Sequence, residues 1–193
     1  MMAAPRVGVL ALQGDVQEHL RLLEACGADA RPVRLPDELR GLQGLVIPGG
    51  ESTTMSSLID RFGLLEPLRE ALGNGTACLT TCAGTILVAK SIRDGLPGQL
   101  SLGVLDIVVR RNAFGRQLRS GEIELEMPAI GLEPIRVALI RAPAIEEVGE
   151  EVEVLATYEG QPAAVRQGHH LGLIFHPEIT GDPRLHQLFL AGL

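Results

Sequence analysis

Hydrophobic residues occur along this chain in short runs that are separated by turn-forming residues. The runs at Val7–Leu12, Gly44–Ile47 and Ala77–Thr81 show no regular alternation of apolar and polar positions. This pattern is typical of central parallel strands, which are buried on both faces. A weaker run at Arg31–Leu35 contains Pro32, so we expect this strand near the edge of the sheet.

The segment after the first strand has the spacing of an amphipathic helix. Its apolar residues recur every three or four positions, at Val16, Leu20, Leu23 and Cys26. Asp15 precedes this segment and Glu18 follows three residues later, which predicts a capping box at the helix N-terminus. Gly27 is expected to end the helix.

The order of the predicted elements indicates the fold class. Further helices are expected after Ser52, over Leu64–Leu72 and over Ala83–Lys90, which makes the order β-α-β-β-α-α-β-α. This order predicts an α/β fold of the flavodoxin-like, doubly wound kind, with a mostly parallel sheet and helices on both faces. The second half is mostly strand-like, and we expect antiparallel strands that extend or flank the sheet. These strands are predicted at Val104–Arg110, Gly121–Glu126, Ile135–Ile140, Val152–Tyr158, Ala163–Arg166 and Leu171–Phe175. A last helix is predicted over Pro183–Leu190, with Asp182 as its N-terminal cap.

The composition agrees with one small domain. The chain has 193 residues, of which 46% are hydrophobic and 3% aromatic, so aliphatic side chains must build the core. Without a linker or repeat, residues 1–193 are expected to form a single domain. A net charge of −7 without a basic cluster argues against a nucleic-acid partner, and no apolar run is long enough to cross a membrane. The three cysteines lack the spacing of a disulfide framework, which predicts reduced thiols in a cytoplasmic protein.

Cys82 lies between a predicted strand and a predicted helix, in the sequence T-T-C-A-G. A cysteine on such a turn is exposed at its tip, and the N-terminus of the following helix favours the thiolate. This is the nucleophile-elbow arrangement with sulfur in place of a serine oxygen, and Gly84 provides the small residue that the turn needs. Considered alone, a cysteine in such a stretch is more often a small buried hydrophobic residue.

His176 and Glu178 follow the predicted strand Leu171–Phe175. In an extended chain, residues two positions apart point to the same side, so the carboxylate can orient the imidazole. The alternative is a turn with a surface salt bridge. Ligands of doubly wound sheets bind beyond the carboxyl ends of the strands, where Cys82 and His176 are both expected. Together these residues predict a Cys-His-Glu relay of nucleophile, acid–base and orienting group.

Two glycines, Gly49 and Gly50, end the strand Gly44–Ile47. Their backbone amides can face a ligand without obstruction, and acyl transfer needs such donors for its oxyanion. We expect the amides of Gly50 and Ala83 to form the oxyanion hole. A phosphate-binding loop is the alternative, but neither of the common glycine-rich phosphate motifs is present. The chain shows no coherent set of metal ligands, and we expect neither a metal nor an organic cofactor.

Several motifs together resemble one family. The segments P-G-G-E-S-T-T-M, T-C-A-G, R-N-A-F-G-R-Q, I-R-A-P and F-H-P-E are similar to the glutaminase subunits of pyridoxal 5′-phosphate synthase. The segment A-L-Q-G-D-V-Q-E-H resembles the opening motif of that family. The cysteine elbow and the His-x-Glu pair are shared with class I glutamine amidotransferases in general, whereas the other segments are typical of the vitamin B6 branch.

The resemblance implies a function. Members of the family hydrolyse L-glutamine to L-glutamate and ammonia, and the ammonia passes to a synthase subunit within a hetero-oligomeric complex. That subunit builds pyridoxal 5′-phosphate from a pentose phosphate and a triose phosphate. Cys82 would be the nucleophile, and His176 and Glu178 would complete the triad. The implied glutamine-binding residues are Gly50, Glu51, Ser52, Arg111, Ile140 and Arg141.

The residue types support part of this assignment and raise alternatives. A guanidinium such as that of Arg111 suits a carboxylate, although either arginine could instead serve a partner interface or a surface ion pair. The family usually has glycine at the position of Thr80 and a larger apolar residue at that of Thr85. A β-branched Thr80 is expected to crowd the turn. A cysteine peptidase and a non-catalytic scaffold weakened by Thr80 therefore remain as alternative functions.

Overall fold

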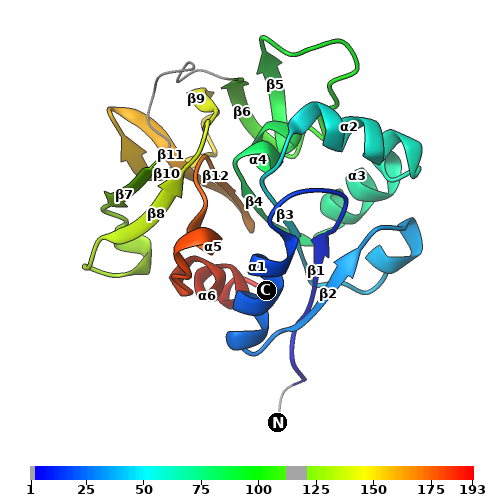
Figure 1. The fold of residues 1–193 in the computed structure, drawn as a ribbon, viewed down its shortest axis with the longest axis horizontal. Coiled ribbons are helices and arrows are strands. Elements are labelled where there is room, and N and C mark those ends of the chain that lie inside the picture. Colours follow the sequence, from blue (N-terminus) through cyan, green and yellow to red (C-terminus); the bar gives the residue numbers. More distant parts are fainter. Residues whose placement is uncertain (1–2, 112–120) are drawn as a thin grey trace.

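The computed structural model describes residues 3–111 and 121–193, and it places a seven-stranded sheet in the middle of the molecule (Figure 1). The order of the strands across this sheet is β10-β11-β12-β4-β3-β1-β2. Their bounds are β1 Arg6–Leu10, β2 Asp29–Val33, β3 Gly44–Ile47, β4 Ala77–Thr81, β10 Glu153–Tyr158, β11 Gln161–Gln167 and β12 His170–Leu173. Strands β2, β1, β3, β4 and β12 are parallel, whereas β11 pairs in the antiparallel sense with β12 and β10. The predicted flavodoxin-like sheet with added antiparallel strands is therefore confirmed.

Helices cover both faces of this sheet (Figure 1). The α-helices are α1 Val16–Ala25, α2 Ser52–Arg61, α3 Leu65–Gly73, α4 Ala83–Val88, α5 Pro177–Thr180 and α6 Arg184–Ala191, with 3₁₀ turns η1 Pro36–Leu39 and η2 Pro128–Ile130. Successive side chains of a strand point to opposite faces. In β4, Thr81 contacts His19 of α1, whereas Thr80 contacts Thr85 of α4. Helices α1 and α4 therefore pack on opposite faces.

Two smaller sheets lie beside the main one. One joins β5 Ala89–Arg93, β6 Leu105–Arg110 and β9 Ala144–Val148, and the other is the antiparallel pair β7 Gly121–Leu125 and β8 Ile135–Leu139. Strands β5 and β9 were not predicted. The helix expected over Ala83–Lys90 ends at Val88 because the next residues pair in parallel with β6. Tertiary pairing has overridden the local helical pattern here.

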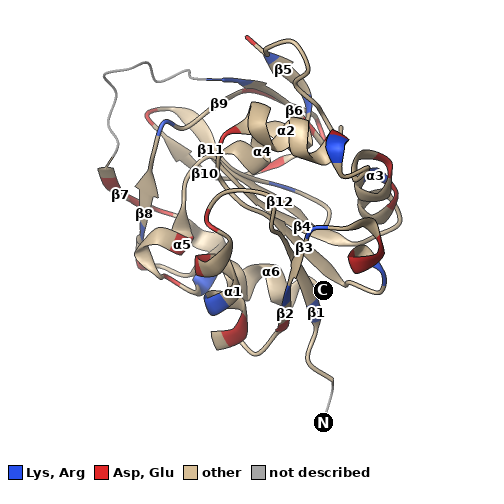
Figure 2. Cartoon of the chain, turned by 45° about the vertical axis from the view of Figure 1, so that its right-hand side comes forward, with Lys and Arg blue, Asp and Glu red and all other residues tan. Residues whose placement is uncertain are grey.

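The central strands were the most predictable part of the fold. Strands β3 and β4 have the bounds that the apolar runs predicted, and β2 lies at the sheet edge as Pro32 suggested. Figure 2 shows the charged residues mainly on the helices and peripheral strands, while β3, β4 and β12 carry none. These strands are buried on both faces within an aliphatic core. Within residues 3–111 and 121–193, no helix has the length and apolarity that crossing a bilayer requires.

The predicted capping box of α1 is wrong in one respect. Asp15 occupies the N-cap position, but its side chain accepts no capping hydrogen bond. Its carboxylate oxygen Oδ2 instead lies 3.3 Å from Nδ1 of His176, which belongs to a distant part of the chain. An electrostatic contact with an imidazole has replaced the local bond, and it directs Asp15 towards the candidate site.

Candidate active site

Cys82 forms a strained turn between β4 and α4. Its φ and ψ angles are 47° and −106°, a conformation that non-glycine residues rarely adopt. The amide of Cys82 donates to the carbonyl of Leu173 on β12 (2.8 Å), and its carbonyl accepts from the amide of Thr85 (3.1 Å). The same residue therefore ends the strand ladder and begins the helix. Its Sγ atom projects towards the carbonyl oxygen of Ile140, 3.7 Å away. This is the elbow geometry that the sequence predicted.

Gly84 has a packing role beside the elbow. A Cβ atom at this position would lie 2.1 Å from the carbonyl oxygen of Ile47 in β3. Only glycine therefore allows the first turn of α4 to approach the end of β3 this closely. The close contact brings the Cys82 turn next to the loop that contains Gly49 and Gly50.

The expected crowding at Thr80 is not observed. Thr80 is a regular strand residue and does not have a positive φ angle. Its hydroxyl shares a hydrogen bond with that of Thr85 (2.8 Å) and reaches the carbonyl of Leu171 (3.2 Å). Thr85 also bonds to both backbone groups of Leu173. The two threonines thus satisfy each other and the neighbouring strand, which explains why the turn accommodates a β-branched residue.

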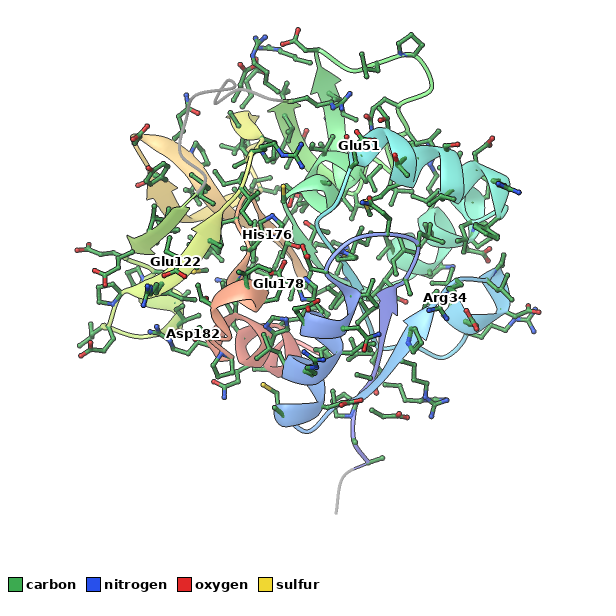
Figure 3. The ribbon with its side chains drawn as sticks, viewed as in Figure 1. Arg34, Glu51, Glu122, His176, Glu178 and Asp182 are labelled. Atoms are coloured by element: carbon green, nitrogen blue, oxygen red, sulfur yellow. The ribbon has the colours of Figure 1, made fainter. Side chains whose placement is uncertain are left out.

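His176 and Glu178 meet, although not in the extended conformation that was predicted. His176 is the N-cap of α5, and Glu178 lies in the first turn of that helix with Pro177 between them. The Nδ1 atom of His176 lies 2.7 Å from Oε1 of Glu178, and both side chains are at least 95% buried. The backbone of His176 also pairs with Ala138 of β8 in both directions. Figure 3 shows the two side chains together in the middle of the molecule.

The charges around His176 favour its protonated form. Burial alone lowers the pKa of His176, but the Asp15 carboxylate, the Cys82 thiol and the Glu178 carboxylate raise it to about 12. Burial likewise raises the pKa of Glu178, whereas hydrogen bonds from His176 and His19 lower it to about 2. The structure therefore brings an imidazolium and a carboxylate together beside the Cys82 sulfur, as the predicted relay requires.

Asp15 places a second carboxylate against the same imidazole nitrogen. Ligand atoms of Asp15, His176 and Glu178 lie within 4.8 Å of one another, which is the spacing of a possible cation site. The direct hydrogen bond between His176 and Glu178 already accounts for their separation. A protonated Nδ1 has no lone pair for a metal, so these groups are better described as an ion-pair cluster.

The glycine loop approaches the imidazole closely. A Cβ atom on Gly49 would lie 2.3 Å from Cε1 of His176, so the ring packs directly on the backbone at this point. The side-chain oxygen of Gln13 accepts a hydrogen bond from the Glu51 amide (2.7 Å) and holds the loop. Among the residues that the structure describes, the amides of Gly50 and Ala83 have no hydrogen-bond acceptor. Both amides border the cavity described next, where they are available to a ligand.

One cavity of about 300 Å³ collects most of the predicted site residues. Of the predicted residues, it is lined by Gly50, Glu51, Ser52, Cys82, Ala83, Arg111, Ile140, Arg141 and His176. Glu178 lies behind His176 and outside the lining. The remaining lining residues are Gln13, Gly14, Asp15 and Ile86, to which sequence reasoning assigned no role in the site. Their presence in the A-L-Q-G-D motif was the available signal for the first three.

Arg111 and Glu51 face each other across this cavity. The guanidinium of Arg111 is 8% exposed, and its Nη2 atom lies 3.3 Å from Oε1 of Glu51. Glu51 also caps α2, because its carboxylate accepts hydrogen bonds from the amides of Thr53 and Thr54. Burial raises the pKa of Glu51, but the bonds from these threonines lower it to about 2. Figure 3 shows Glu51 at the start of α2.

Two of the predicted binding residues have special local features. The side chain of Ser52 is hydrogen-bonded within the protein, and Arg141 has an unusual backbone conformation. The hydroxyl of Ser52 donates to Oε1 of Gln99 (3.2 Å), and its carbonyl accepts from the hydroxyl of Ser56 (2.8 Å). Arg141 has a φ angle of 45°, a rare value for a non-glycine residue. Of the motif R-N-A-F-G-R-Q, only Arg111 falls within the described residues.

His19 is the residue that sequence reasoning most clearly missed. His19 stands alone on the predicted helix after the first strand, with no partner residue near it in the sequence. In the structure its side chain is fully buried, with Nε2 lying 3.5 Å from Oε1 of Glu178. Only the fold brings α1 and α5 together, and the signal in the sequence was the place of His19 at the end of the A-L-Q-G-D-V-Q-E-H motif.

Comparisons with known proteins agree with this geometry. Residues 9–193 match the SNO glutamine amidotransferase family. The chain is 56% identical over 196 residues to "Pyridoxal 5'-phosphate synthase subunit PdxT" of Mycolicibacterium vanbaalenii, with complete coverage of both chains. It is 54% identical over 189 residues to the protein of the same name from Parafrankia sp., covering 98% of this chain and 93% of that one.

A solved structure gives the same result. A crystal structure of a glutamine amidotransferase superposes with a TM-score of 0.88 at 48% sequence identity. The match covers 97% of this chain and 99% of that chain, so the likeness extends over the whole fold. The chain therefore belongs to the SNO glutamine amidotransferase family.

Proposed function

We propose that this chain is the glutaminase subunit of a pyridoxal 5′-phosphate synthase, and that it hydrolyses L-glutamine to L-glutamate and ammonia. Cys82 is the nucleophile, His176 is the acid and base, and Glu178 orients and stabilises the imidazolium. The observation that carries the proposal is the meeting of a strained cysteine elbow and a buried His–Glu pair at one cavity. Family membership and the synthase-subunit names of the relatives support it.

The reaction proceeds through a thioester. The Cys82 sulfur attacks the side-chain carboxamide carbon of glutamine, and the carbonyl oxygen becomes an oxyanion held by the amides of Gly50 and Ala83. When the C–N bond breaks, His176 gives its proton to the departing ammonia. The neutral imidazole then takes a proton from water, whose oxygen attacks the thioester carbon and releases glutamate. No step requires a metal or an organic cofactor.

The cavity lining provides contacts for the rest of the substrate. Arg111 is a buried guanidinium, and such a group suits the α-carboxylate of glutamine. The carboxylate of Glu51, held ionised by its capping bonds, suits the α-ammonium group. Ser52, Ile140 and Arg141 line the same space and shape it around the substrate.

The proposal also covers the partner of the protein, its domain organisation and its location in the cell. Ammonia passes from this chain to a synthase subunit in a hetero-oligomeric complex, because free ammonia would be lost to solvent. Residues 1–193 act as a single glutamine amidotransferase domain, which the family match over residues 9–193 supports. We place the protein in the cytoplasm, where its three free cysteines stay reduced.

Two alternatives from the sequence are less well supported. A cysteine peptidase needs an open groove for an extended chain, whereas this cavity holds about 300 Å³ and contains two carboxylates and two arginines. A scaffold that is inactive because of Thr80 requires a distorted elbow, and Thr80 fits the strand without a positive φ angle.

The direct test is ammonia release from glutamine, measured with and without a synthase subunit from a close relative. We expect activity from the wild-type complex and a loss of more than about 10³-fold in Cys82→Ala. Cys26→Ala is the matched control, because Cys26 lies at the far end of α1 and outside the cavity.

The same assay separates the alternatives. Hydrolysis of a peptide but not of glutamine would favour the peptidase. An inactive wild-type complex that Thr80→Gly restores would favour the scaffold. Equal rates for wild type and Cys82→Ala would rule out the proposed nucleophile.

A further inference from the structure

A pair of buried histidines lies directly behind the proposed triad. His19 is on α1 and His186 is on α6, and both residues have no exposed surface. Neither takes part in the reaction steps above. Buried imidazoles that pack beside a functional carboxylate need an explanation, because a buried polar group requires hydrogen-bond partners.

The distances connect this pair to Glu178. Nδ1 of His19 lies 2.9 Å from Nε2 of His186, which is a good hydrogen-bond distance. On its other side, Nε2 of His19 lies 3.4 Å from the hydroxyl oxygen of Thr81 and 3.5 Å from Oε1 of Glu178. His19 therefore bridges α6 to the carboxylate that holds His176.

These contacts determine where His19 carries a proton. Its Nε2 atom faces a hydroxyl oxygen and a carboxylate oxygen, and an ionised carboxylate can only accept. A lone pair on Nε2 would repel Glu178, so this nitrogen must be protonated. Nδ1 can then accept the Nε2 proton of His186, whose ring stays neutral because burial lowers its pKa to about 3.

Glu178 needs such a donor. Its side chain has no exposed surface, and Oε2 has no hydrogen-bond partner among the described residues. His176 supplies one strong bond to Oε1. A carboxylate in a buried site stays ionised only if it is paired and hydrogen-bonded, and Nε2 of His19 is the second ring nitrogen near Oε1, at 3.5 Å.

We propose that His19 is a positioning residue of the glutaminase, which rests on the proposed function above. His19 donates from Nε2 to Oε1 of Glu178, the same oxygen that His176 contacts, and His186 fixes the tautomer of His19. Oε1 of the carboxylate is thereby held by two imidazoles. It keeps its charge and its direction while His176 gains and loses a proton during each turnover.

Three other titratable groups lie near the contact between His19 and Glu178. Asp15, from the loop before α1, lies within 4.8 Å of the His176 and Glu178 ligand atoms and repels the carboxylate. His176 attracts it from its own segment, and His186 faces it from α6 beyond His19. Of these elements, α1 contributes the second donor to Oε1 of Glu178, in addition to His176.

Two substitutions at one position separate this role from simple packing. The amide nitrogen of a glutamine side chain can occupy the place of Nε2, whereas that of an asparagine matches Nδ1. His19→Gln keeps a donor to Glu178 and weakens the contact with His186. His19→Asn keeps a group near His186 and removes the donor to Glu178. Both variants are measured as the full chain with the synthase subunit.

The expected results differ between the variants. A hydrogen bond to a buried charge corresponds to about 10- to 100-fold in rate, so His19→Asn should lower kcat by that factor. Its KM for glutamine should stay within about twofold, because His19 lies outside the cavity. The acid limb of kcat/KM should move to higher pH, since Glu178 protonates more easily. His19→Gln should stay within about threefold of wild type in kcat.

A second measurement does not depend on activity. Carbon-13 labelling of glutamate side chains follows the titration of Glu178 by NMR, and the pKa of its carboxyl should rise in His19→Asn but not in His19→Gln. An inactive wild-type enzyme would contradict the proposed function while this titration still tests the bridge. Equal losses in both variants, with unchanged pH profiles and an unchanged Glu178 titration, would show that His19 only fills space.

Discussion

The two faces of β4 carry buried polar clusters of different kinds. On one face, Thr80 and Thr85 bond to each other and to the backbone of β12, and every buried oxygen in this cluster is satisfied. On the other face, Thr81 meets His19, which leads to His186 and Glu178. Among the described residues, three buried side-chain atoms lack a partner, and two of them belong to this second cluster, Oε2 of Glu178 and Nδ1 of His186.

The first cluster supports the structure, whereas the second consists of groups that can take part in chemistry. Neutral hydroxyls with complete hydrogen bonding hold the elbow in place, and they have no proton to exchange near neutral pH. The second cluster consists of groups that can titrate and that have incomplete bonding, and it surrounds the proposed triad. A folded protein retains such a strained electrostatic arrangement where a reaction uses it. The comparison predicts that changes on the two faces will affect different measurements.

The largest expected effect is that of Glu178→Gln, on the titratable face. The amide keeps the shape but removes the charge that stabilises the His176 imidazolium, so kcat should fall by about 10²- to 10⁴-fold. The measurement is ammonia release across pH, and the pKa of His176 should also fall because a raising influence is lost. Glu24→Gln, on the exposed side of α1, serves as the control. A rate close to wild type would remove Glu178 from the triad.

The intermediate effect is on stability, from the neutral face. Thr85→Val removes the oxygen that bonds to Thr80 and to both backbone groups of Leu173, which should destabilise the fold by about 1–3 kcal/mol. Urea unfolding measures this change. The acid and alkaline limbs of the pH–rate profile of the glutaminase should stay at the same pH, because no charged group has been altered. Thr81→Val, which loses only a 3.4 Å contact with His19, should have the smaller effect on stability.

A shift of those limbs in Thr85→Val would mean that the two faces are coupled through β4. The comparison between a structural and a chemical face would then fail, whatever the change in stability.

The effect that should be smallest near neutral pH concerns the pH dependence of stability. Burial lowers the pKa of His186 to about 3, with a further lowering from His19. Because the folded pKa lies below the unfolded value of about 6.5, only the unfolded chain binds a proton between these values, and stability falls as pH drops from 6.5 towards 3. His186→Gln cannot titrate but keeps an amide donor for His19. Its unfolding free energy should therefore decline less over this range, by up to about 1 kcal/mol per pH unit.

Gln187→Asn is the control for this measurement, because Gln187 is exposed on the same helix and does not titrate. Part of the acid sensitivity should remain in His186→Gln, since burial also lowers the pKa of His170, to about 4. If the slope is the same in His186→Gln and wild type, His186 is not a neutral buried group in the folded state.

Much of the fold could be predicted from local patterns. Gly44–Ile47 and Ala77–Thr81 are continuous buried runs, and their strands have the predicted bounds. The second half was less predictable because its short strands depend on distant partners. Residues 89 and 90 were predicted as the end of a helix, but residues 89–93 pair with β6, and residues 144–148 form β9 by pairing with the same strand.

The chain by itself determined which groups could do chemistry. Cys82 stands where a strand must turn into a helix, His176 and Glu178 are two residues apart after an apolar run, and the motifs around them are specific to one family. These features depend on residue order, and order along the chain is what local physical rules can interpret.

Only the tertiary structure decided what surrounds those groups. The Asp15 carboxylate contacts His176 and does not cap its own helix. Thr80 fits into β4 because its hydroxyl bonds to that of Thr85. His19 of α1 contacts Glu178 of α5. Each contact joins residues whose neighbourhood depends on how the helices pack on the sheet. Hydrogen bonds and charge interactions act over a few ångströms in space, and separation along the chain does not predict that distance.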